Sequence, residues 1–330
     1  MANDTNRREF FAAGLAATGL MAAAAPLAAP EARAQAGANP RSMGARFRAL
    51  MNGPDPLICA NAYDLMTARL IEVRGFKGVF LGSSGANQEL LGLPDQAVVS
   101  VSELVNYAIV VASGVNIPIV ADLDDLGATP LNVYRFAKQA ERGGIACAAF
   151  DDRMPLNRAT AYSAPGVMPK ARMIDNIHAA ADARTDMVLV ARCLAPAPNK
   201  NYTEMLDRAA AYAEAGADLI WMGLPTVQDY VKAADMIKKP LFGVIGNAQI
   251  AATPAAMKAA RITVGQTGPV VGIALGAVDR ALTETLATGR MVEAQKGALS
   301  REISDKVEQV EALNARAAKY NLPKGSATER

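Results

Sequence analysis

The sequence predicts an α/β fold, a (β/α)8 barrel of the TIM type, from three observations. Short apolar segments alternate with helical segments eight times, and no long polar linker interrupts the alternation. The segment 117–121 is entirely apolar, which is typical of a strand in a parallel sheet that is buried on both faces, and acidic residues follow it directly. Similar turns containing Gly-Gly or Gly-Ala end a helix before a strand at 141–145 and 214–219.

A doubly wound open sheet is the main alternative fold. Such a sheet normally carries a Gly-rich phosphate-binding turn after its first strand. In this chain the position reads Asn61-Ala62-Tyr63-Asp64, so the barrel is favoured.

The expected elements follow from short apolar runs for strands and from apolar periodicity for helices. Strands are expected at 57–60, 78–81, 117–121, 145–150, 187–191, 218–222, 241–245 and either 262–264 or 269–273. Helices are expected near 46–50 and at 64–74, 101–113, 131–142, 171–184, 203–215, 227–237 and 275–288. A charged amphipathic segment follows at 291–320, and we expect a neighbouring subunit to cover its apolar stripe.

The N-terminal residues resemble an export signal. Arg7-Arg8 precedes an Ala-rich apolar run at 12–29, and Ala32-Arg33-Ala34 fits a cleavage site. A membrane anchor is the alternative, disfavoured because prolines interrupt the run. We therefore expect a twin-arginine signal at 1–34, a lead-in at 35–54, the barrel at 55–289, a helical extension at 290–330, and a periplasmic location without a membrane anchor.

Composition excludes several functions. Lys+Arg total 34 against 32 Asp+Glu, a net charge of +2, and no basic stripe occurs, so nucleic acid is not an expected partner. The single histidine, His178, excludes Ser-His-Asp hydrolysis and His-ligated zinc. Cys59, Cys147 and Cys193 each lie in an apolar run and are interpreted as buried hydrophobic residues.

Acidic residues follow the third expected strand. Side chains two apart on an extended chain share a side, so Asp122 and Asp124 are expected to converge while Asp125 points elsewhere. A hard divalent cation such as Mg²⁺ would relieve the repulsion between them. A solvated acidic loop that caps the following helix is the alternative interpretation.

Other strand ends carry residues suited to bind an anion. Gly82-Ser83-Ser84-Gly85 reads as a small turn whose backbone N–H groups can hold a carboxylate. Arg192 has the planar fork that suits a carboxylate, although a structural Arg–Asp pair is the alternative. Asp95, in the long loop after the second strand, and Asp151, after the fourth, are expected at the same rim.

These motifs together resemble the isocitrate lyase/phosphoenolpyruvate mutase superfamily over about residues 55–290. The residues that carry the resemblance are Asn61-Ala62-Tyr63-Asp64 with Ala68-Arg69-Leu70, Gly82-Ser83-Ser84-Gly85, Gly92-Leu93-Pro94-Asp95, Ala121-Asp122-Leu123-Asp124, Asp151-Asp152 and Ala191-Arg192. The resemblance implies a barrel with its last helix exchanged between subunits, in a dimer or tetramer. It also implies Mg²⁺, or alternatively Mn²⁺, held partly through water by Asp122, Asp124 and Asp151, with the Gly82–Ser84 turn and Arg192 gripping the carboxylate.

The activity that the resemblance implies is cleavage of a C–C bond in a small 2-oxo or 2-hydroxy carboxylate through an enolate. Family lyases carry a loop cysteine after the fourth strand, whereas residues 154–162 here hold no cysteine. Oxaloacetate-type decarboxylation, phosphonate processing and non-catalytic carboxylate binding are therefore the alternatives. Arg192, Tyr63 and Asp95 are the expected catalytic residues, with Tyr63 or Tyr162 managing the proton.

Overall fold

A computed structural model of the chain describes residues 42–96, 98–154, 166–194 and 202–322. The chain divides into two units, residues 1–40 and 41–330. The expected export signal at 1–34 and Tyr162 lie outside the described residues. Within the described part, no helix has the length and apolar character needed to cross a membrane.

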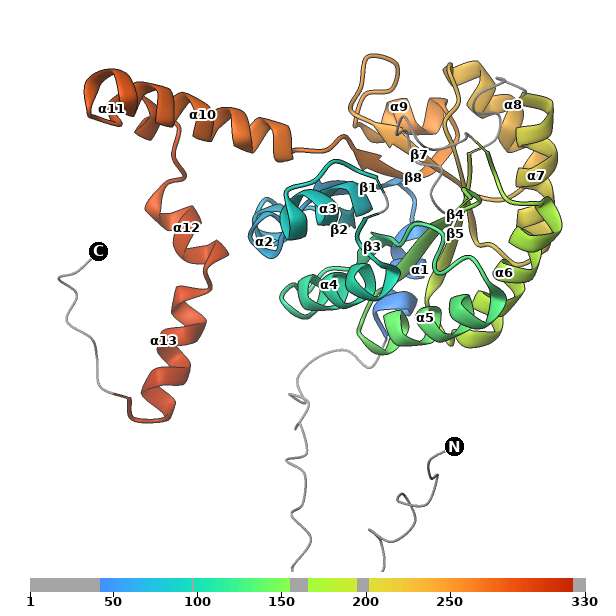
Figure 1. The fold of residues 1–330 in the computed structure, drawn as a ribbon, viewed down its shortest axis with the longest axis horizontal. Coiled ribbons are helices and arrows are strands. Elements are labelled where there is room, and N and C mark those ends of the chain that lie inside the picture. The colour runs from blue at the N-terminus through green and yellow to red at the C-terminus, as the bar shows by residue number, and fades with distance from the viewer. Residues whose placement is uncertain (1–41, 97, 155–165, 195–201, 323–330) are drawn as a thin grey trace, which may run out of the picture. The chain divides into compact units, whose positions relative to one another are not determined.

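Eight parallel strands close into a barrel in which β1 pairs with both β2 and β8 (Figure 1). The strands are β1 Leu57–Ala62, β2 Gly78–Leu81, β3 Ile119–Asp122, β4 Cys147–Asp151, β5 Val188–Cys193, β6 Leu219–Met222, β7 Leu241–Ile245 and β8 Ile262–Thr267. The predicted barrel is therefore confirmed. The eighth strand lies at the first of the two predicted positions, and the alternative at 269–273 is wrong because Val271 already begins a helix.

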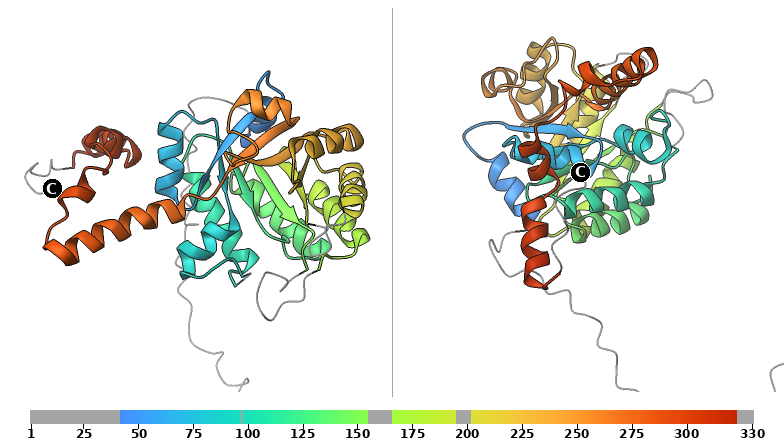
Figure 2. Two further views of the ribbon diagram at one scale, coloured as in Figure 1. Left: turned by 90° about the horizontal axis from the view of Figure 1, so that it is seen from above. Right: turned by 90° about the vertical axis from the view of Figure 1, so that its left-hand side faces the viewer.

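Helices precede the first strand, lie between consecutive strands and follow the last one, and those between strands surround the barrel (Figures 1 and 2). They are α1 Met43–Met51, α2 Leu65–Val73, α3 Ser83–Leu91, α4 Val101–Ser113, α5 Pro130–Arg142, α6 Lys170–Ala183, α7 Tyr202–Glu214, α8 Val227–Ile237, α9 Pro254–Ala259, α10 Val271–Thr288, α11 Val292–Gln295, α12 Arg301–Val307 and α13 Val310–Lys319. Two of them were not predicted, α3 and α9. Thr253 caps α9 and Pro254 occupies its first turn, a start signal that the sequence does contain.

Alternation along each strand divides the buried residues into an interior and an exterior set. Phe80, Trp221 and Phe242 meet inside the barrel, with ring centroids 4.9 to 5.9 Å apart. Phe47 and Met51 of α1 join the same interior cluster and close its N-terminal end. Cys59 and Cys147 lie inside the barrel and Cys193 outside it, all three buried and unbridged, as their interpretation required.

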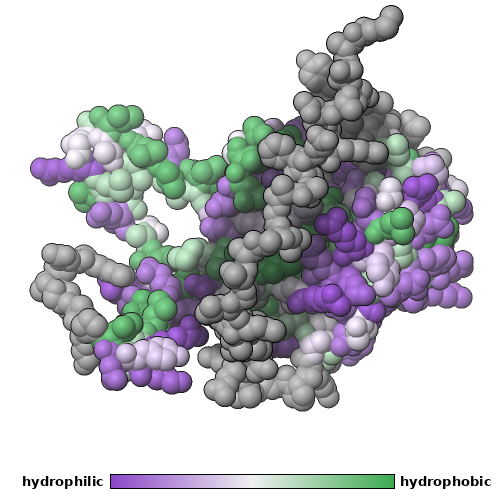
Figure 3. Space-filling view, turned by 60° about the horizontal axis from the view of Figure 1, so that its bottom comes forward, coloured by the Kyte–Doolittle hydropathy of each residue, from purple (hydrophilic) through white to green (hydrophobic). Residues whose placement is uncertain are grey.

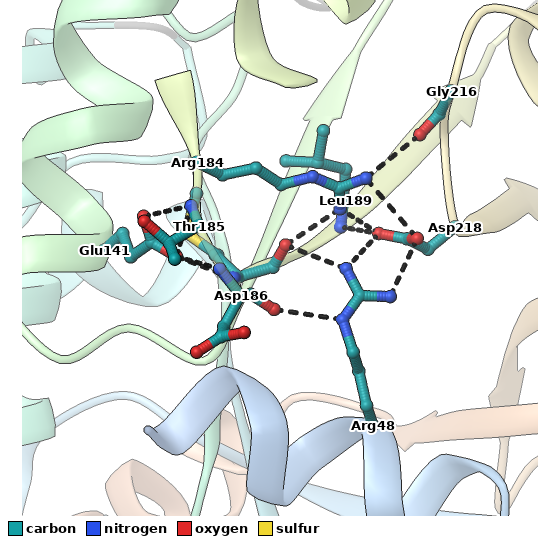
Figure 4. A network of polar contacts seen from close by, with 9 residues as sticks. Arg48, Glu141, Arg184, Thr185, Asp186, Leu189, Gly216 and Asp218 are labelled. Atoms are coloured by element: carbon teal, nitrogen blue, oxygen red, sulfur yellow. Dashed lines mark hydrogen bonds and ion pairs between the residues drawn. The ribbon is translucent and has the colours of Figure 1, made fainter. Parts of the chain in front are cut away.

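A polar network fixes β5 at the N-terminal end of the barrel (Figure 4). Glu141 of α5 accepts hydrogen bonds from the backbone N–H groups of three consecutive residues, 185–187, just before β5. Asp218, just before β6, accepts from Arg48 of α1 at 2.9 Å and from Arg184. Asp218 also accepts from the Leu189 N–H at 2.9 Å. The strand that carries Arg192 is thus held at its opposite end by charged groups from three other segments.

The C-terminal segment forms helices, and no further strand follows β8 in the described residues up to 322. Helix α10 contains no buried residue, and apolar side chains are exposed along this part of the chain (Figure 3). Helix α12 packs on α2, where Val307 is buried and the Arg69 guanidinium donates to its carbonyl at 3.5 Å. The expected amphipathic segment 291–320 is therefore divided into three short helices.

Candidate active site

Three charged side chains at the carboxyl ends of neighbouring strands point into the mouth of the barrel. Each lies two positions beyond a residue of the interior cluster, and side chains two apart on a strand share a face. The pairs are Val120 and Asp122 on β3, Ala149 and Asp151 on β4, and Val190 and Arg192 on β5. The register of β4 and β5 places Asp151 directly beside Arg192. The structure therefore brings together Asp122, Asp151 and Arg192, three of the residues that the sequence predicted at one rim.

The Arg192 side chain is held between an acid and an aromatic ring. Its Nη1 atom donates to Asp122 Oδ2 at 3.2 Å, and its Cζ atom lies 3.9 Å from the Trp221 ring centroid. The side chain remains 26% exposed, so a ligand can reach it. Stacking on an indole stabilises a cation while leaving its edge available for hydrogen bonds. Trp221 was not predicted as part of the site, because a Trp within an apolar strand is indistinguishable from core.

Three carboxylates here are buried, and Asp122 and Asp151 are close enough to influence one another. Asp122 is 7% exposed, Asp124 8% and Asp151 2%. Burial raises the pKa of Asp122 to about 6, a rise that Arg192 and Arg153 oppose and the neighbouring Asp151 carboxylate reinforces. Among the described residues, Asp122 Oδ1 has no hydrogen-bond partner although it is buried. A buried carboxylate oxygen without a partner is costly, and a cation beside it would remove that cost.

Asp124 takes a conformation that the sequence did not predict. The strand ends at Asp122, and Asp124 adopts a left-handed backbone with φ of 54°. Its carbonyl accepts the Asp151 N–H at 2.7 Å, which joins the loop after β3 to the end of β4. The expected convergence of Asp122 and Asp124 by strand alternation is therefore wrong in its geometry. The chain turns immediately after Asp122, so Asp124 is placed by loop contacts instead.

The donor set suits a cation that keeps water in its coordination shell. Within the residues that the structure covers, no group of three or more His, Cys, Asp or Glu side chains could hold a metal directly. Mg²⁺ commonly binds one or two carboxylates and retains several waters. The unpartnered Asp122 oxygen, with Asp151 nearby, fits such a site better than it fits a cage made only of protein ligands.

The predicted Gly82–Ser84 turn is the start of helix α3. Gly82 is the N-cap and offers no side-chain cap, while Ser83 and Gly85 are buried in the first turn. The first N–H groups of a helix have no partner within it, and the helix dipole favours an anion there. A Cβ on Gly85 would lie 3.1 Å from that of Tyr63, closer than most such contacts, so glycine favours this close approach. The backbone N–H groups on which the predicted anion-binding role depends are therefore those at the start of a helix, and not those of a turn.

The remaining predicted residues lie on the flanking segments. Tyr63 follows β1 and is half-buried, and burial together with Asp64 and Glu89 raises its pKa. Its hydroxyl therefore stays protonated at neutral pH. Asp95 is half-buried in the segment between α3 and α4. His178 is exposed on α6.

A cavity of about 720 Å³ lies at the opposite, N-terminal end of the barrel. Cations line it, but Lys258 pairs with Asp55 at 2.7 Å and Arg261 pairs with Asp235. Lys238 lies at the C-terminus of α8, where a cation complements the helix dipole. These contacts account for three of the four cations in the lining, all but Lys239, without a ligand.

A closed (β/α)8 barrel with buried acids and a guanidinium at its carboxyl-terminal mouth has the architecture of a TIM-barrel enzyme. The family model described as phosphoenolpyruvate phosphomutase matches residues 47–286. The chain belongs to this family, within the isocitrate lyase/phosphoenolpyruvate mutase superfamily.

Named relatives resemble the chain to different extents. It is 30% identical over 190 residues to 2,3-dimethylmalate lyase of Eubacterium barkeri, a match that covers 57% of this chain and 65% of that protein, less than two thirds of its length. It is 29% identical to oxaloacetate decarboxylase of Rhodopseudomonas palustris, over 85% of this chain and 97% of the relative. The structure of phosphonopyruvate hydrolase in complex with oxalate and Mg²⁺ has a TM-score of 0.74 and 24% identity, over 85% of this chain and 99% of the other. The expected superfamily is therefore confirmed, and its named relatives include lyases and decarboxylases.

Proposed function

We propose that this protein is a Mg²⁺-dependent lyase that cleaves a C–C bond of a small 2-oxo or 2-hydroxy carboxylate through an enolate. One observation carries the proposal. The Arg192 guanidinium lies 3.2 Å from Asp122 at the barrel mouth, where a buried acid without a full set of partners adjoins an accessible cation. Such a site can take a metal ion and a carboxylate side by side.

The chain's own residues have distinct tasks in this proposal. Arg192 and the first N–H groups of α3 bind the carboxylate and stabilise negative charge on oxygen as it develops. Tyr63, whose raised pKa keeps it protonated, donates a proton to the carbon left after cleavage. Asp122, Asp124 and Asp151 would hold Mg²⁺, or Mn²⁺, partly through water, and the ion would supply electrostatic stabilisation of the enolate charge. Asp95 would assist from the rim.

Decarboxylation of a 2-oxo dicarboxylate is the second candidate. The match to oxaloacetate decarboxylase spans 97% of that relative, whereas the match to 2,3-dimethylmalate lyase spans 65%. Loss of CO2 also leaves an enolate, and it needs no cysteine acid on the loop after β4. Both candidates use the same anion-binding groups.

A panel of 2-oxo acids, 2-hydroxy dicarboxylates and phosphonopyruvate, incubated with the mature protein and Mg²⁺, tests the proposal. Product analysis should show one C–C bond broken, and Arg192→Ala should reduce kcat/KM by at least about a hundredfold. Cleavage of phosphonopyruvate alone would replace the lyase assignment. Tight carboxylate binding without turnover of any compound would identify a binding protein instead.

Two further expectations belong to this proposal. The C-terminal helices would pack on a second copy of the chain, because α10 exposes an apolar stripe. Residues 1–34 would direct export to the periplasm by a twin-arginine signal.

A further inference from the structure

We propose that Asp152, held by Tyr212 and Arg208 of α7, is a positioning residue that sets the place of Arg192. The inference rests on the function proposed above, in which Arg192 binds the carboxylate of the substrate. Asp152, Tyr212 and Arg208 would then support the site from the side of the barrel wall that faces the helices.

Asp152 binds the Arg192 segment through both its backbone and its side chain. Its N–H donates to the Arg192 carbonyl at 3.2 Å, just beyond the last paired residues of β4 and β5. Its Oδ1 atom accepts the Leu194 N–H at 2.8 Å. The two bonds fix the backbone on both sides of Cys193, at the point where the pairing of β4 with β5 ends.

Helix α7 holds the Asp152 carboxylate from the other side. Tyr212 donates its hydroxyl to Asp152 Oδ2 at 2.8 Å, and Arg208 Nη1 lies 3.8 Å from the same oxygen. Arg208 also donates to the Met168 carbonyl at 2.8 Å. Asp152 is fully buried, so its charge requires these partners.

A purely structural ion pair is the ordinary explanation of such a cluster. Two features favour a role in positioning. Asp152 directly follows Asp151, so β4 sends one acid into the barrel mouth and the next toward α7. In addition, the guanidinium of Arg192 has to fit between the Trp221 ring and Asp122, at 3.9 and 3.2 Å. A backbone shift of a few tenths of an ångström at Arg192 changes both contacts.

The protein contains a single tryptophan, Trp221, which reports on the position of Arg192 without any ligand. Tyr212→Phe removes one bond to Asp152 and keeps the ring. We expect the emission maximum and iodide quenching of Trp221 to change in Tyr212→Phe in the same direction as in Arg192→Ala. In the Arg192→Ala background, the Tyr212 substitution should add no further change. The proposal would be overturned if Tyr212→Phe changed the Trp221 spectrum equally in the wild-type and Arg192→Ala backgrounds. It would also be overturned if Tyr212→Phe changed the spectrum in neither background.

Calorimetry with oxalate and Mg²⁺ gives the second readout. Tyr212→Phe should weaken oxalate binding roughly fivefold when Arg192 is present, and less than about twofold in Arg192→Lys, whose flexible ammonium depends less on the backbone. Asp152→Asn, which keeps an acceptor for the Leu194 N–H, should retain more affinity than Asp152→Ala. A simple loss of thermal stability would produce neither the dependence on Arg192 nor this partial rescue.

Tyr230→Phe is the matched control for oxalate binding. Tyr230 of α8 is also buried and donates its hydroxyl to the Met222 carbonyl at 3.0 Å, at the end of β6. We expect it to lower the melting temperature as Tyr212→Phe does while oxalate affinity stays within about twofold. An equal loss of affinity in both variants would contradict a specific role for Asp152. If the wild-type protein binds no oxalate, the proposed function fails, whereas the fluorescence comparison still decides whether Asp152 positions Arg192.

Discussion

Arg192 is the residue whose surroundings decide what the site can bind. Among the described residues, its guanidinium makes one side-chain hydrogen bond, to Asp122, and rests on the face of Trp221. A guanidinium carries five N–H donors in a rigid fork, so several remain for a ligand. A planar carboxylate that binds this fork would lie beside the partly unpaired Asp122.

Replacing Arg192 with lysine tests the need for the fork. Lysine keeps the positive charge but cannot bind a carboxylate with two parallel N–H groups or stack as a plane. We expect Arg192→Lys to weaken carboxylate binding about 10- to 100-fold, measured as Kd for oxalate or KM for the substrate found. Arg153→Lys is the control and should bind the carboxylate as the wild type does. The Nε atom of Arg153 lies 3.8 Å from Asp151, and its guanidinium stacks on no described ring. Equal affinity in Arg192→Lys and wild type would show that only charge matters here.

The residues of the site differ in how far the sequence could predict them. Asp122, Asp151 and Arg192 could be predicted because each follows an apolar run at the face where barrel sites form. The left-handed conformation of Asp124 leaves no pattern in the sequence, since its φ of 54° depends on the loop contacts around it. Asp152 was recognised as part of a motif, but its outward direction depends on where β4 ends.

At the scale of elements, the carboxyl-terminal site depends on how β5 is fixed at its other end. Glu141, Arg48, Arg184 and Asp218 fasten the start of that strand to α1, α5 and β6 (Figure 4). Helix α3 was missed for a local reason. Its first residues, Gly82-Ser83-Ser84-Gly85, have low helix propensity, and tertiary burial of this turn overrides that preference.

Asp218 should make the stability of the barrel depend on pH. Burial alone would raise its pKa, but hydrogen bonds from Arg48, Arg184 and the Leu189 N–H hold that pKa below its usual value. A lowered pKa in the folded state gives stability that is present above the unfolded value, about 3.9, and is lost as the pH falls through the folded value. We expect Asp218→Asn to cost about 2 kcal/mol of unfolding free energy at pH 7, with the difference shrinking below about pH 4.

Urea unfolding at several pH values measures this difference. Asp235→Asn is the matched control, because Asp235 pairs with Arg261 while both side chains are more than half exposed. Its effect should stay within about 0.5 kcal/mol at every pH. A pH-independent penalty for Asp218→Asn would mean that its charge does not stabilise the fold.

For the whole molecule, the alternation of strands and helices was sufficient to predict the barrel. The C-terminal helices were less predictable, because their apolar stripe indicates a covering surface without identifying it. On α10 that stripe comprises Leu275, Val278, Leu282 and Leu286, and their exposed fractions range from 53% to 91%. Such a row at helical spacing is unusual on a free surface.

Light scattering on the purified protein tests our proposal that a second copy covers this stripe. We expect the wild type to form a dimer or tetramer and Leu282→Glu to shift the mass toward the monomer, since burying a charge at an apolar contact costs several kcal/mol. Thr283→Glu, at the next exposed position of α10, should leave the mass unchanged. A monomeric wild type would contradict assembly through α10.

Calorimetric titration of oxalate, with Mg²⁺ present and with the metal removed by EDTA, tests most directly whether one site takes both metal and carboxylate. We expect Mg²⁺ to strengthen oxalate binding at least tenfold, and Asp122→Asn to remove that gain while Asp125→Asn, one of the neighbouring acids, retains it. Equal oxalate affinity with and without the metal, or an undiminished metal effect in Asp122→Asn, would contradict the account.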